Sequence, residues 1–280
     1  MRQSAADERI RIGCQSWGYE DWVTRPAGDH IFYPPGTKKA EMLAAYSRVF
    51  DTIEVDATLY GIPASTTLEK WHRETPDDFK FSLKFPREVT HDRRLAPESL
   101  PVMREFCERA RLLGDKLAMM LIQLPPSFEG SKENAQNLRR LLNELPRDQK
   151  FAVEFRHRDW FIDWTYRELE AAGASLCLVE GPWLPREVMF DAIGKVTADR
   201  CYIRIMGERD LERFDRIYRR RDDVLEQWAA NIRRIEADEI YVYCDNYFEG
   251  FAPATANKLL RLLGLGERDF DTVTRQKSLF

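Results

Sequence analysis

The stretch "FKFSLKFPREVTHDRRLAPESLPVMREFCERARLLGDKLAMMLIQL" (79–124) decides the fold class. Its two ends, 79–85 and 117–124, are apolar runs of strand length. The segment between them, 99–114, has the periodicity of a helix and ends at Gly114. A buried strand, a helix and a second buried strand form the repeating unit of a parallel sheet. The stretch therefore predicts an α/β protein.

The same alternation continues along the chain. Further strand-like runs, with helical segments between them, lie at 9–14, 51–57, 150–155, 174–179, 200–205 and 239–244. Eight such units over roughly 260 residues are what a (β/α)8 barrel needs. The absence of a linker favours this closed barrel over the alternative, an open doubly wound sheet.

We expect a single domain over residues 1–280, with a strand–helix core at about 9–264 and a C-terminal tail at 265–280. The sixth helical unit is expected to be weak or irregular. Its segment, "GPWLPREVMFDAIGKVTAD" (181–199), contains two prolines and little amphipathic pattern.

The composition indicates a cytoplasmic protein and narrows the choice of partners. The formal net charge of the 280 residues is −4, so no overall basic field points to a nucleic acid or a membrane surface. No apolar run approaches the roughly 20 residues that cross a bilayer, and segment 1–13 is too polar for a signal peptide. The five cysteines show no CxxC spacing, which argues for reduced thiols. The oligomeric state is not indicated.

Polar side chains recur at alternate positions of the strand-like runs. In a parallel barrel both faces of a strand are buried, so one parity faces the helices and the other faces the interior. The polar parity lies toward the carboxyl ends of the runs, where barrel enzymes place their sites. Its members are Glu54, Asp56, Lys84, Gln123, Glu154, Arg156 and Arg204. Asp245 and Asn246 follow the eighth run, and the sequence leaves open which of them faces inward.

The charges of this set nearly cancel, with three acids against three bases before Asp245 is counted. An unpaired buried charge costs several kcal/mol, so we expect these groups to pair with one another or with a ligand. A divalent metal gathers an excess of carboxylates, for which the three cations would compete. No cofactor is therefore predicted, and a divalent metal is disfavoured. A network that only fills the barrel interior is the structural alternative.

The first functional hypothesis is an enzyme, a hydrolase, lyase or isomerase, that binds a small anionic or phosphorylated substrate such as a sugar phosphate. Carboxylates suit proton transfer, and arginine and lysine suit an anion. The expected catalytic residues are Glu54, Asp56 and Glu154. The expected substrate-binding residues are Lys84, Arg156, Arg204, Asn246, Asp245, Trp17, Tyr60 and His91. Cys14 as a nucleophile and Lys84 as a Schiff base are weaker options.

Two loops add further candidates. The aromatic segment 16–36 would stack a ring of the ligand or would form a satellite core above the barrel. Segment 207–223 is rich in both arginines and acids and is interpreted as a solvated lid. Gly207 and Gly250 follow strands seven and eight, where many barrels bind phosphate.

Two other hypotheses stay open. In a nucleic-acid-binding or nucleic-acid-processing protein, loop arginines would contact phosphates while the aromatic segment stacks a displaced base. These arginines are Arg87, Arg93, Arg94, Arg219, Arg220 and Arg221. In a non-catalytic binding barrel, the charged interior would be purely structural.

Several segments together resemble one known family. They are "IGCQSWGYEDW", "FYPPG", "FDTIEVDATLYGIPA", "FKFSLKFPREVTH", "VEFRHRDW", "IRIMG", "YVYCDNYFEGFAPATA" and the terminal "SLF". Over nearly its whole length the chain is similar to the DUF72 (YecE-like) family, whose members have a TIM-barrel-like fold and no established reaction. The family's polar positions correspond here to Glu54, Lys84, Glu154, Arg156, Arg204 and Asn246.

The chain departs from that family at two places. Relatives typically have HG where this chain has Met206-Gly207, so a mechanism that requires that histidine does not fit this protein. They commonly have NN where this chain has Asp245-Asn246, which adds an acid.

Overall fold

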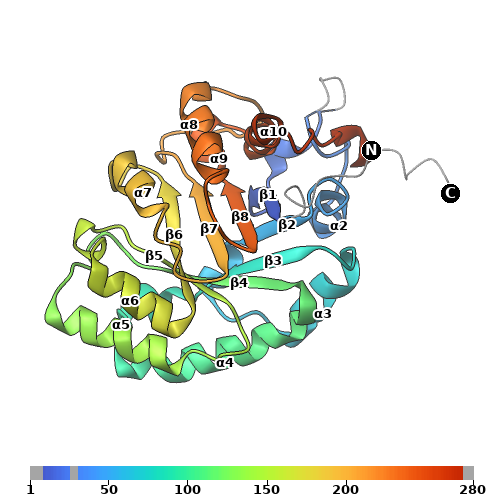
Figure 1. Cartoon of the computed structure of the whole chain (residues 1–280). Helices are drawn as coiled ribbons and strands as arrows, with labels where there is room; N and C mark the ends of the chain where they lie inside the picture. Colours follow the sequence, from blue (N-terminus) through green and yellow to red (C-terminus); the bar gives the residue numbers. More distant parts are fainter. Residues whose placement is uncertain (1–8, 26–30, 274–280) are drawn as a thin grey trace.

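The strands form one closed parallel barrel in the computed structural model, which describes residues 9–25 and 31–273 (Figure 1). Each strand pairs with the next in the chain, and the eighth pairs with the first, which confirms the predicted (β/α)8 barrel. The strands are β1 (Ile10–Gln15), β2 (Thr52–Val55), β3 (Lys80–Lys84), β4 (Leu117–Gln123), β5 (Phe151–Glu154), β6 (Ala174–Glu180), β7 (Arg200–Ile205) and β8 (Glu239–Cys244).

Helices alternate with the strands and lie around the outside of the barrel (Figure 1). They are α2 (Met42–Tyr46), α3 (Ser65–Glu74), α4 (Leu100–Ala110), α5 (Lys132–Glu144), α6 (Asp163–Ala172), α7 (Arg186–Ala192), α8 (Asp222–Ile232), α9 (Asn246–Glu249) and α10 (Ala252–Leu263). Short 3-10 and π-helical turns are η1 (Glu20–Trp22), η2 (Lys39–Glu41), η3 (Ala57–Tyr60), η4 (Glu88–Asp92), η5 (Pro97–Ser99), η6 (Arg111–Lys116), η7 (Arg158–Trp160) and η8 (Phe270–Val273). None of the helices in these ranges is long and apolar enough to span a membrane.

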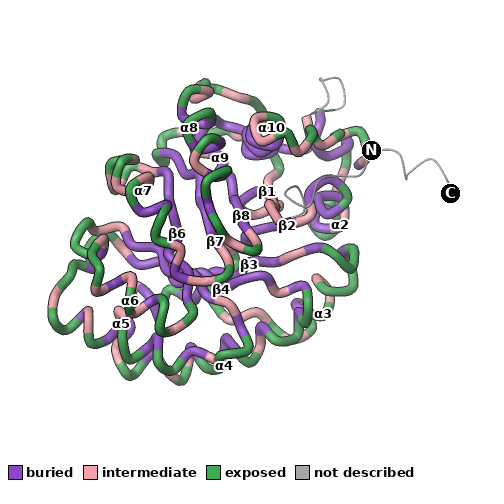
Figure 2. The backbone as a smooth tube through the Cα atoms, viewed as in Figure 1, coloured by how far each residue is buried: buried purple, intermediate pink, exposed green. Residues whose placement is uncertain are grey.

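The alternation of side chains divides the core into two layers. One parity of each strand packs against the helices in a large apolar core, and Figure 2 shows the strands as the most continuously buried part of the chain. The other parity fills the lower barrel interior with a separate cluster: Ala118, Met119, Leu121, Ala152, Cys177, Tyr202, Tyr241 and Tyr243. This layer fills the amino-terminal end of the barrel interior. The polar residues of the same parity therefore lie toward the carboxyl ends of the strands.

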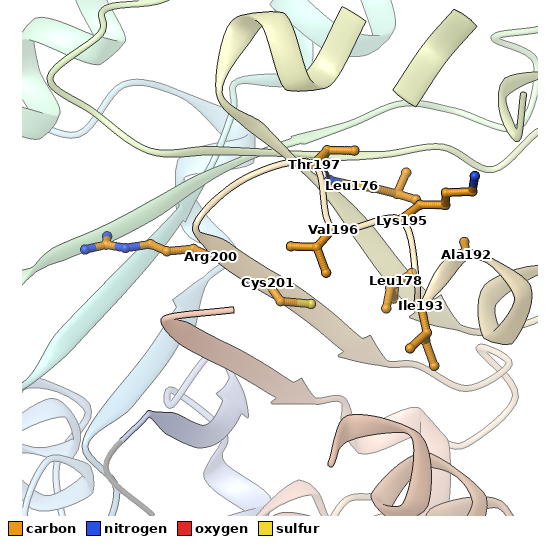
Figure 3. A pocket seen from close by; sticks show the side chains of 9 residues that line it. All are labelled: Leu176, Leu178, Ala192, Ile193, Lys195, Val196, Thr197, Arg200 and Cys201. Carbon is orange, nitrogen blue, oxygen red and sulfur yellow. Dashed lines mark hydrogen bonds between the residues drawn. The ribbon is translucent and has the colours of Figure 1, made fainter. Parts of the chain in front are cut away.

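The sixth unit is irregular, as predicted. Helix α7 has only seven residues, and the loop before it contains Pro182 and Pro185. Between β6, α7 and β7 lies a cavity of about 10 Å³ lined by Leu178, Ile193 and Val196 among others (Figure 3). This volume holds about one water molecule, so the cavity is a packing imperfection beside a short helix and too small for a substrate.

Aromatic side chains of the first loop form a satellite core. Trp22, Phe32 and Tyr33 have no exposed surface, so they cap the barrel and are not available to stack a ligand. Part of the tail, the turn η8 that follows the last strand–helix unit, packs on this core. The ring of Phe270 in η8 is 5.1 Å from that of Phe32, so the segment after α10 covers the cap. Residues 274–280 lie outside the described part of the chain.

Candidate functional site

Arg204 on β7 lies at the centre of the upper barrel interior and has no exposed surface. Its Nε and Nη2 donate to the two carboxylate oxygens of Glu54, at 2.9 and 2.8 Å. Its Nη1 donates to Oε2 of Glu154 at 2.6 Å. One guanidinium therefore joins acids from β2 and β5, which are not neighbouring strands. All three of its nitrogens are engaged, so a substrate anion does not reach Arg204, in contrast to the sequence-based expectation.

Glu154, the last residue of β5, is held between two arginines, Arg156 and Arg204. Its other carboxylate oxygen, Oε1, accepts a hydrogen bond from Nε of Arg156. Burial by itself would raise the pKa of Glu154, but Arg156, Arg204 and Lys84 lower it to about 2. Glu154 is therefore ionised at neutral pH and is a poor proton donor.

Arg156 lies at the edge of the buried network. Its side chain is 11% exposed, and its Cζ atom lies 3.4 Å from the centre of the Trp183 ring. Trp183 belongs to the irregular loop after β6, and Gly181 lets it pack closely, because a Cβ there would lie 2.7 Å from the indole. A stacked arginine between a carboxylate and an indole is fixed in orientation.

Asp56 and Lys84 form a second pair nearer to solvent. The Lys84 Nζ lies 3.1 Å from Oδ1 of Asp56, and their side chains are 4% and 32% exposed. Gln15 connects this pair to the centre, since its Nε2 donates to Glu54 at 2.7 Å and to Asp56 at 3.0 Å. The side chains of Arg204, Glu54, Glu154, Arg156, Asp56 and Lys84 form what we call the charged ring. It extends from the buried Arg204 to the mouth, the open carboxyl-terminal end of the barrel.

The structure shows that Asp245, and not Asn246, faces the ring. Burial raises the pKa of Asp245 to about 7; Asp56 adds to the increase and Arg204 opposes it. The Asn246 Oδ1 instead accepts hydrogen bonds from the Trp22 indole at 3.3 Å and the Ala252 backbone at 2.9 Å. Asn246 therefore holds the cap and the start of α10 through its oxygen, and its expected contact with substrate stays a prediction.

Of the other expected site residues, His91 lies near the charged ring and Tyr60 does not contact it. His91 reaches the mouth: its Nε2 lies 3.4 Å from Nε2 of Gln123, and burial together with Arg156 lowers its pKa. Trp17 is half-buried, and its ring packs edge-on against Trp71 at 5.5 Å. Tyr60 is 76% exposed on η3, and no hydrogen bond or ring contact joins it to the charged ring within the described residues. The expected role of Tyr60 in binding is not supported by its position.

Four side chains of the site were not among the expected site residues, although Tyr202 lies on the polar parity of its strand and Tyr19 in the aromatic first loop. Tyr202 donates from its hydroxyl to Oε2 of Glu54 at 2.7 Å, and Gln15 lies one residue beyond the strand-like run 9–14. Tyr19 in the first loop has a raised pKa, caused by burial and by the charges of Asp245 and Asp56. Trp183, the fourth, lies in a loop, where strand alternation gives no signal.

The weaker candidates have structural explanations. Cys14 is fully buried, and burial raises the pKa of its thiol far from the range of a nucleophile. A Cβ at Gly207 would lie 1.9 Å from the carbonyl oxygen of Tyr247, so this glycine permits a close backbone approach. The Gly250 amide donates to Asn246 at 2.7 Å and is not free for a phosphate. The residue at the family's histidine position, Met206, is buried among apolar side chains.

Several loop arginines of the nucleic-acid hypothesis are paired locally. Arg87 contacts Asp92 and Arg93 contacts Glu88, at 3.0 and 2.6 Å. Arg219 donates to Asp210 at 2.6 Å. These pairs reduce the basic character of the loops. In ranges 9–25 and 31–273, no group of three His, Cys, Asp or Glu side chains is arranged to hold a metal ion.

This fold and site define a (β/α)8 barrel protein with a charged ring at the carboxyl ends of its strands. Residues 11–278 match the model of the family described as "Protein of unknown function DUF72", and the chain belongs to that family. The resemblance drawn from the sequence motifs is confirmed.

Named relatives and solved structures agree with this assignment. The UPF0759 protein YunF of Bacillus subtilis (strain 168) is 27% identical over 94% of this chain and 99% of YunF. The UPF0759 protein YecE of Escherichia coli (strain K12) is 30% identical over 54% of this chain and 50% of YecE. The crystal structure of a DUF72 family protein from Thermotoga maritima MSB8 has a TM-score of 0.72 and 28% identity, covering 91% of this chain and 99% of that one.

Proposed function

We propose that the protein is an enzyme that binds a small anionic substrate, such as a sugar phosphate, at the carboxyl-terminal mouth of the barrel. The observation that carries this proposal is the position of Arg156. Glu154 and Trp183 fix its guanidinium from two sides. Among the described residues, no hydrogen bond engages its Nη atoms, which leaves donors for a carboxylate or phosphate.

Lys84 supports the same proposal as a second cation of the mouth. Its partner Asp56 is the most exposed acid of the ring, so a substrate anion can reach the Lys84 ammonium from the side of Asp56. His91 is adjacent, and the charges of Arg156 and Lys84 both lower its pKa. A neutral His91 can donate a hydrogen bond to the anion without adding charge.

In this geometry we give the three acids that were expected to be catalytic, Glu54, Asp56 and Glu154, other roles. Glu54 and Glu154 each bind Arg204, and Glu154 also binds Arg156. We assign them to positioning the cations, because their carboxylate oxygens are already bound to arginines and, for Glu154, Arg156, Arg204 and Lys84 lower the pKa. Asp56 orients the substrate together with Lys84.

Sulfate binding tests the proposal, because sulfate is an oxyanion that does not titrate near neutral pH. We expect isothermal titration calorimetry to show binding to the wild-type protein, weakened at least about tenfold in Arg156→Gln, since a charge-assisted hydrogen bond contributes about 1.5–3 kcal/mol. Arg94→Gln is the matched control, because Arg94 is a half-buried loop arginine that donates to Ser127. Equal binding by the two variants would contradict the assignment. Turnover is then sought among phosphorylated and carboxylated sugars, with the neutral sugars as controls.

The two alternatives lead to different results. A nucleic-acid-binding protein would show strongly salt-dependent binding to DNA or RNA in gel shifts, but Arg87, Arg93 and Arg219 are already paired with acids. A non-catalytic barrel with a purely structural network would bind no oxyanion at Arg156.

A further inference from the structure

Asp245 differs from the acids of the charged ring in having no cationic partner. Within the described residues, Glu54 and Glu154 bind Arg204, and Asp56 binds Lys84, whereas no lysine, arginine or histidine lies within ion-pair distance of Asp245. Asp245 is only 3% exposed. A buried carboxyl without a counter-ion is the group of this site that can exchange a proton at moderate cost.

The surroundings of Asp245 are mostly acidic. Asp56 and Glu54 face it from β2 and its following turn, and both raise its pKa; Arg204 on β7 is the charge that lowers it. Tyr19 approaches from the first loop, and the charge of Asp245 raises the pKa of that phenol in turn. Along its own chain, Asp245 follows Cys244 and raises the pKa of that thiol, while the Tyr247 backbone lowers the pKa of Asp245.

These contacts make the protonation of Asp245 depend on whether an anion is bound at the mouth. A substrate anion at Arg156 and Lys84 adds negative charge near Asp56 and competes with it for the Lys84 ammonium. Both effects disfavour a second negative charge on Asp245, because like charges in a buried site do not ionise together.

We propose that Asp245 takes up a proton when an oxyanion binds at Arg156 and Lys84, and that it gives this proton to an oxygen atom of the substrate. This inference rests on the proposed function and narrows it to a substrate that carries both an anionic group and a carbonyl or leaving-group oxygen within reach of β8. In the transfer, the O–H bond of the Asp245 carboxyl breaks, and a lone pair of the substrate oxygen forms the new O–H bond. The carboxylate of Asp245 is left, and a proton from water restores the acid.

The location of Asp245 suits this role. It lies directly after β8, at the carboxyl end of the barrel, where (β/α)8 enzymes place their catalytic groups. Its backbone amide donates to the Ile205 carbonyl at 2.9 Å, so the carboxyl is anchored to β7 beside Arg204. Its pKa of about 7 also lies where proton transfer at neutral pH is efficient.

The test measures protons together with binding. Sulfate is titrated into the wild-type protein by calorimetry at pH 6.5 to 8.5 in buffers of different ionisation enthalpy, which gives the number of protons taken up. We expect about half a proton per sulfate near pH 7.5, and an affinity that falls by up to about tenfold in total as the pH rises through 7 and 8. In Asp245→Asn, sulfate still binds, but the proton uptake and this pH dependence are lost.

His91→Gln is the matched variant, because His91 is the histidine at the same mouth and the alternative acceptor of the proton. Loss of proton uptake in His91→Gln but not in Asp245→Asn would overturn the inference, as would sulfate binding by the wild-type protein without proton uptake. Either result would leave the proposed function intact. Binding that is indifferent to Arg156→Gln would overturn both.

A second measurement needs no variant. The carboxyl carbon of Asp245 is followed by 13C NMR in the wild-type protein with and without sulfate. We expect the titration midpoint to move upward with sulfate by about one pH unit, a tenfold change in proton affinity. An unchanged midpoint, with sulfate bound, would overturn the inference.

Discussion

Arg204 and Glu54 form a bidentate ion pair inside the barrel, and neither side chain has any exposed surface. Glu154 shares the same guanidinium, and Tyr202 and Gln15 satisfy the Glu54 oxygens further. Removing a buried ion pair from water costs free energy. Its electrostatic attraction offsets that cost only when its geometry is good and its hydrogen bonds are complete. This buried network fixes the positions of the β2, β5 and β7 ends relative to one another, and those ends carry the mouth.

Breaking this pair from one side should strongly destabilise the fold. Glu54→Gln leaves Arg204 with one carboxylate partner in a fully buried site, and we expect the free energy of unfolding to fall by about 3–5 kcal/mol. Urea denaturation measures this. Glu168→Gln removes an acid from the surface pair with Arg139 and should cost at most about 1 kcal/mol. Similar losses of unfolding free energy in the two variants would contradict the expectation that the buried pair contributes more to stability than the surface pair.

The close approach of the loops after β7 and β8 should depend on a glycine. In Gly207→Ala the new methyl group would lie 1.9 Å from the Tyr247 carbonyl oxygen, so the backbone must move. We expect a loss of about 1–3 kcal/mol, as for an overpacked core position. Gly194→Ala is the control, because a Cβ there meets nothing within 4 Å. Thermal unfolding should show a lower midpoint for Gly207→Ala alone; a normal midpoint would show that these loops adjust freely.

Strand alternation predicted a large part of this site. Glu54, Lys84, Glu154 and Arg204 lie on one parity of four runs, and a strand with two buried faces leaves its polar parity only the barrel interior. Their convergence and near-neutral balance therefore followed from the sequence. The partners did not, because which acid contacts which base depends on distances across the barrel between strands that are not neighbours.

Positions beyond strand ends were harder to predict. The choice between Asp245 and Asn246 was open, because β8 ends at Cys244 and the backbone then turns into α9. Trp183 belongs to a proline-containing loop with no periodicity, so only the fold brings it onto Arg156. The saturation of Arg204 by carboxylates, which excludes it from substrate binding, likewise appears only once three strands are placed.

The unpaired state of Asp245 should make stability depend on pH in a defined direction. Its pKa is about 7 in the folded protein and about 3.9 in an unfolded chain, so the folded state binds more protons between these values. Stability then falls as pH rises from about 4 to 7. Asp245→Asn removes this loss and should be the more stable protein at pH 8, by up to about 4 kcal/mol, and equal to wild type near pH 4. Urea denaturation at both pH values tests this, with the exposed Asp92→Asn as control. A difference that does not change with pH would contradict a protonated Asp245.

Stacking against the Trp183 indole should keep the Arg156 guanidinium in the orientation that binds an anion. In Trp183→Ala the guanidinium loses its stacked face and becomes free to rotate away from Glu154, so sulfate affinity should fall several-fold, in line with about 0.5–2 kcal/mol for a cation–π contact. Trp183→Phe keeps an aromatic face and should retain most of the affinity. The matched control is Trp164→Ala, which removes an equivalent contact with Arg139 on the outer helices α5 and α6. If Trp183→Ala bound sulfate as tightly as Trp164→Ala, Arg156 would be positioned by Glu154 alone.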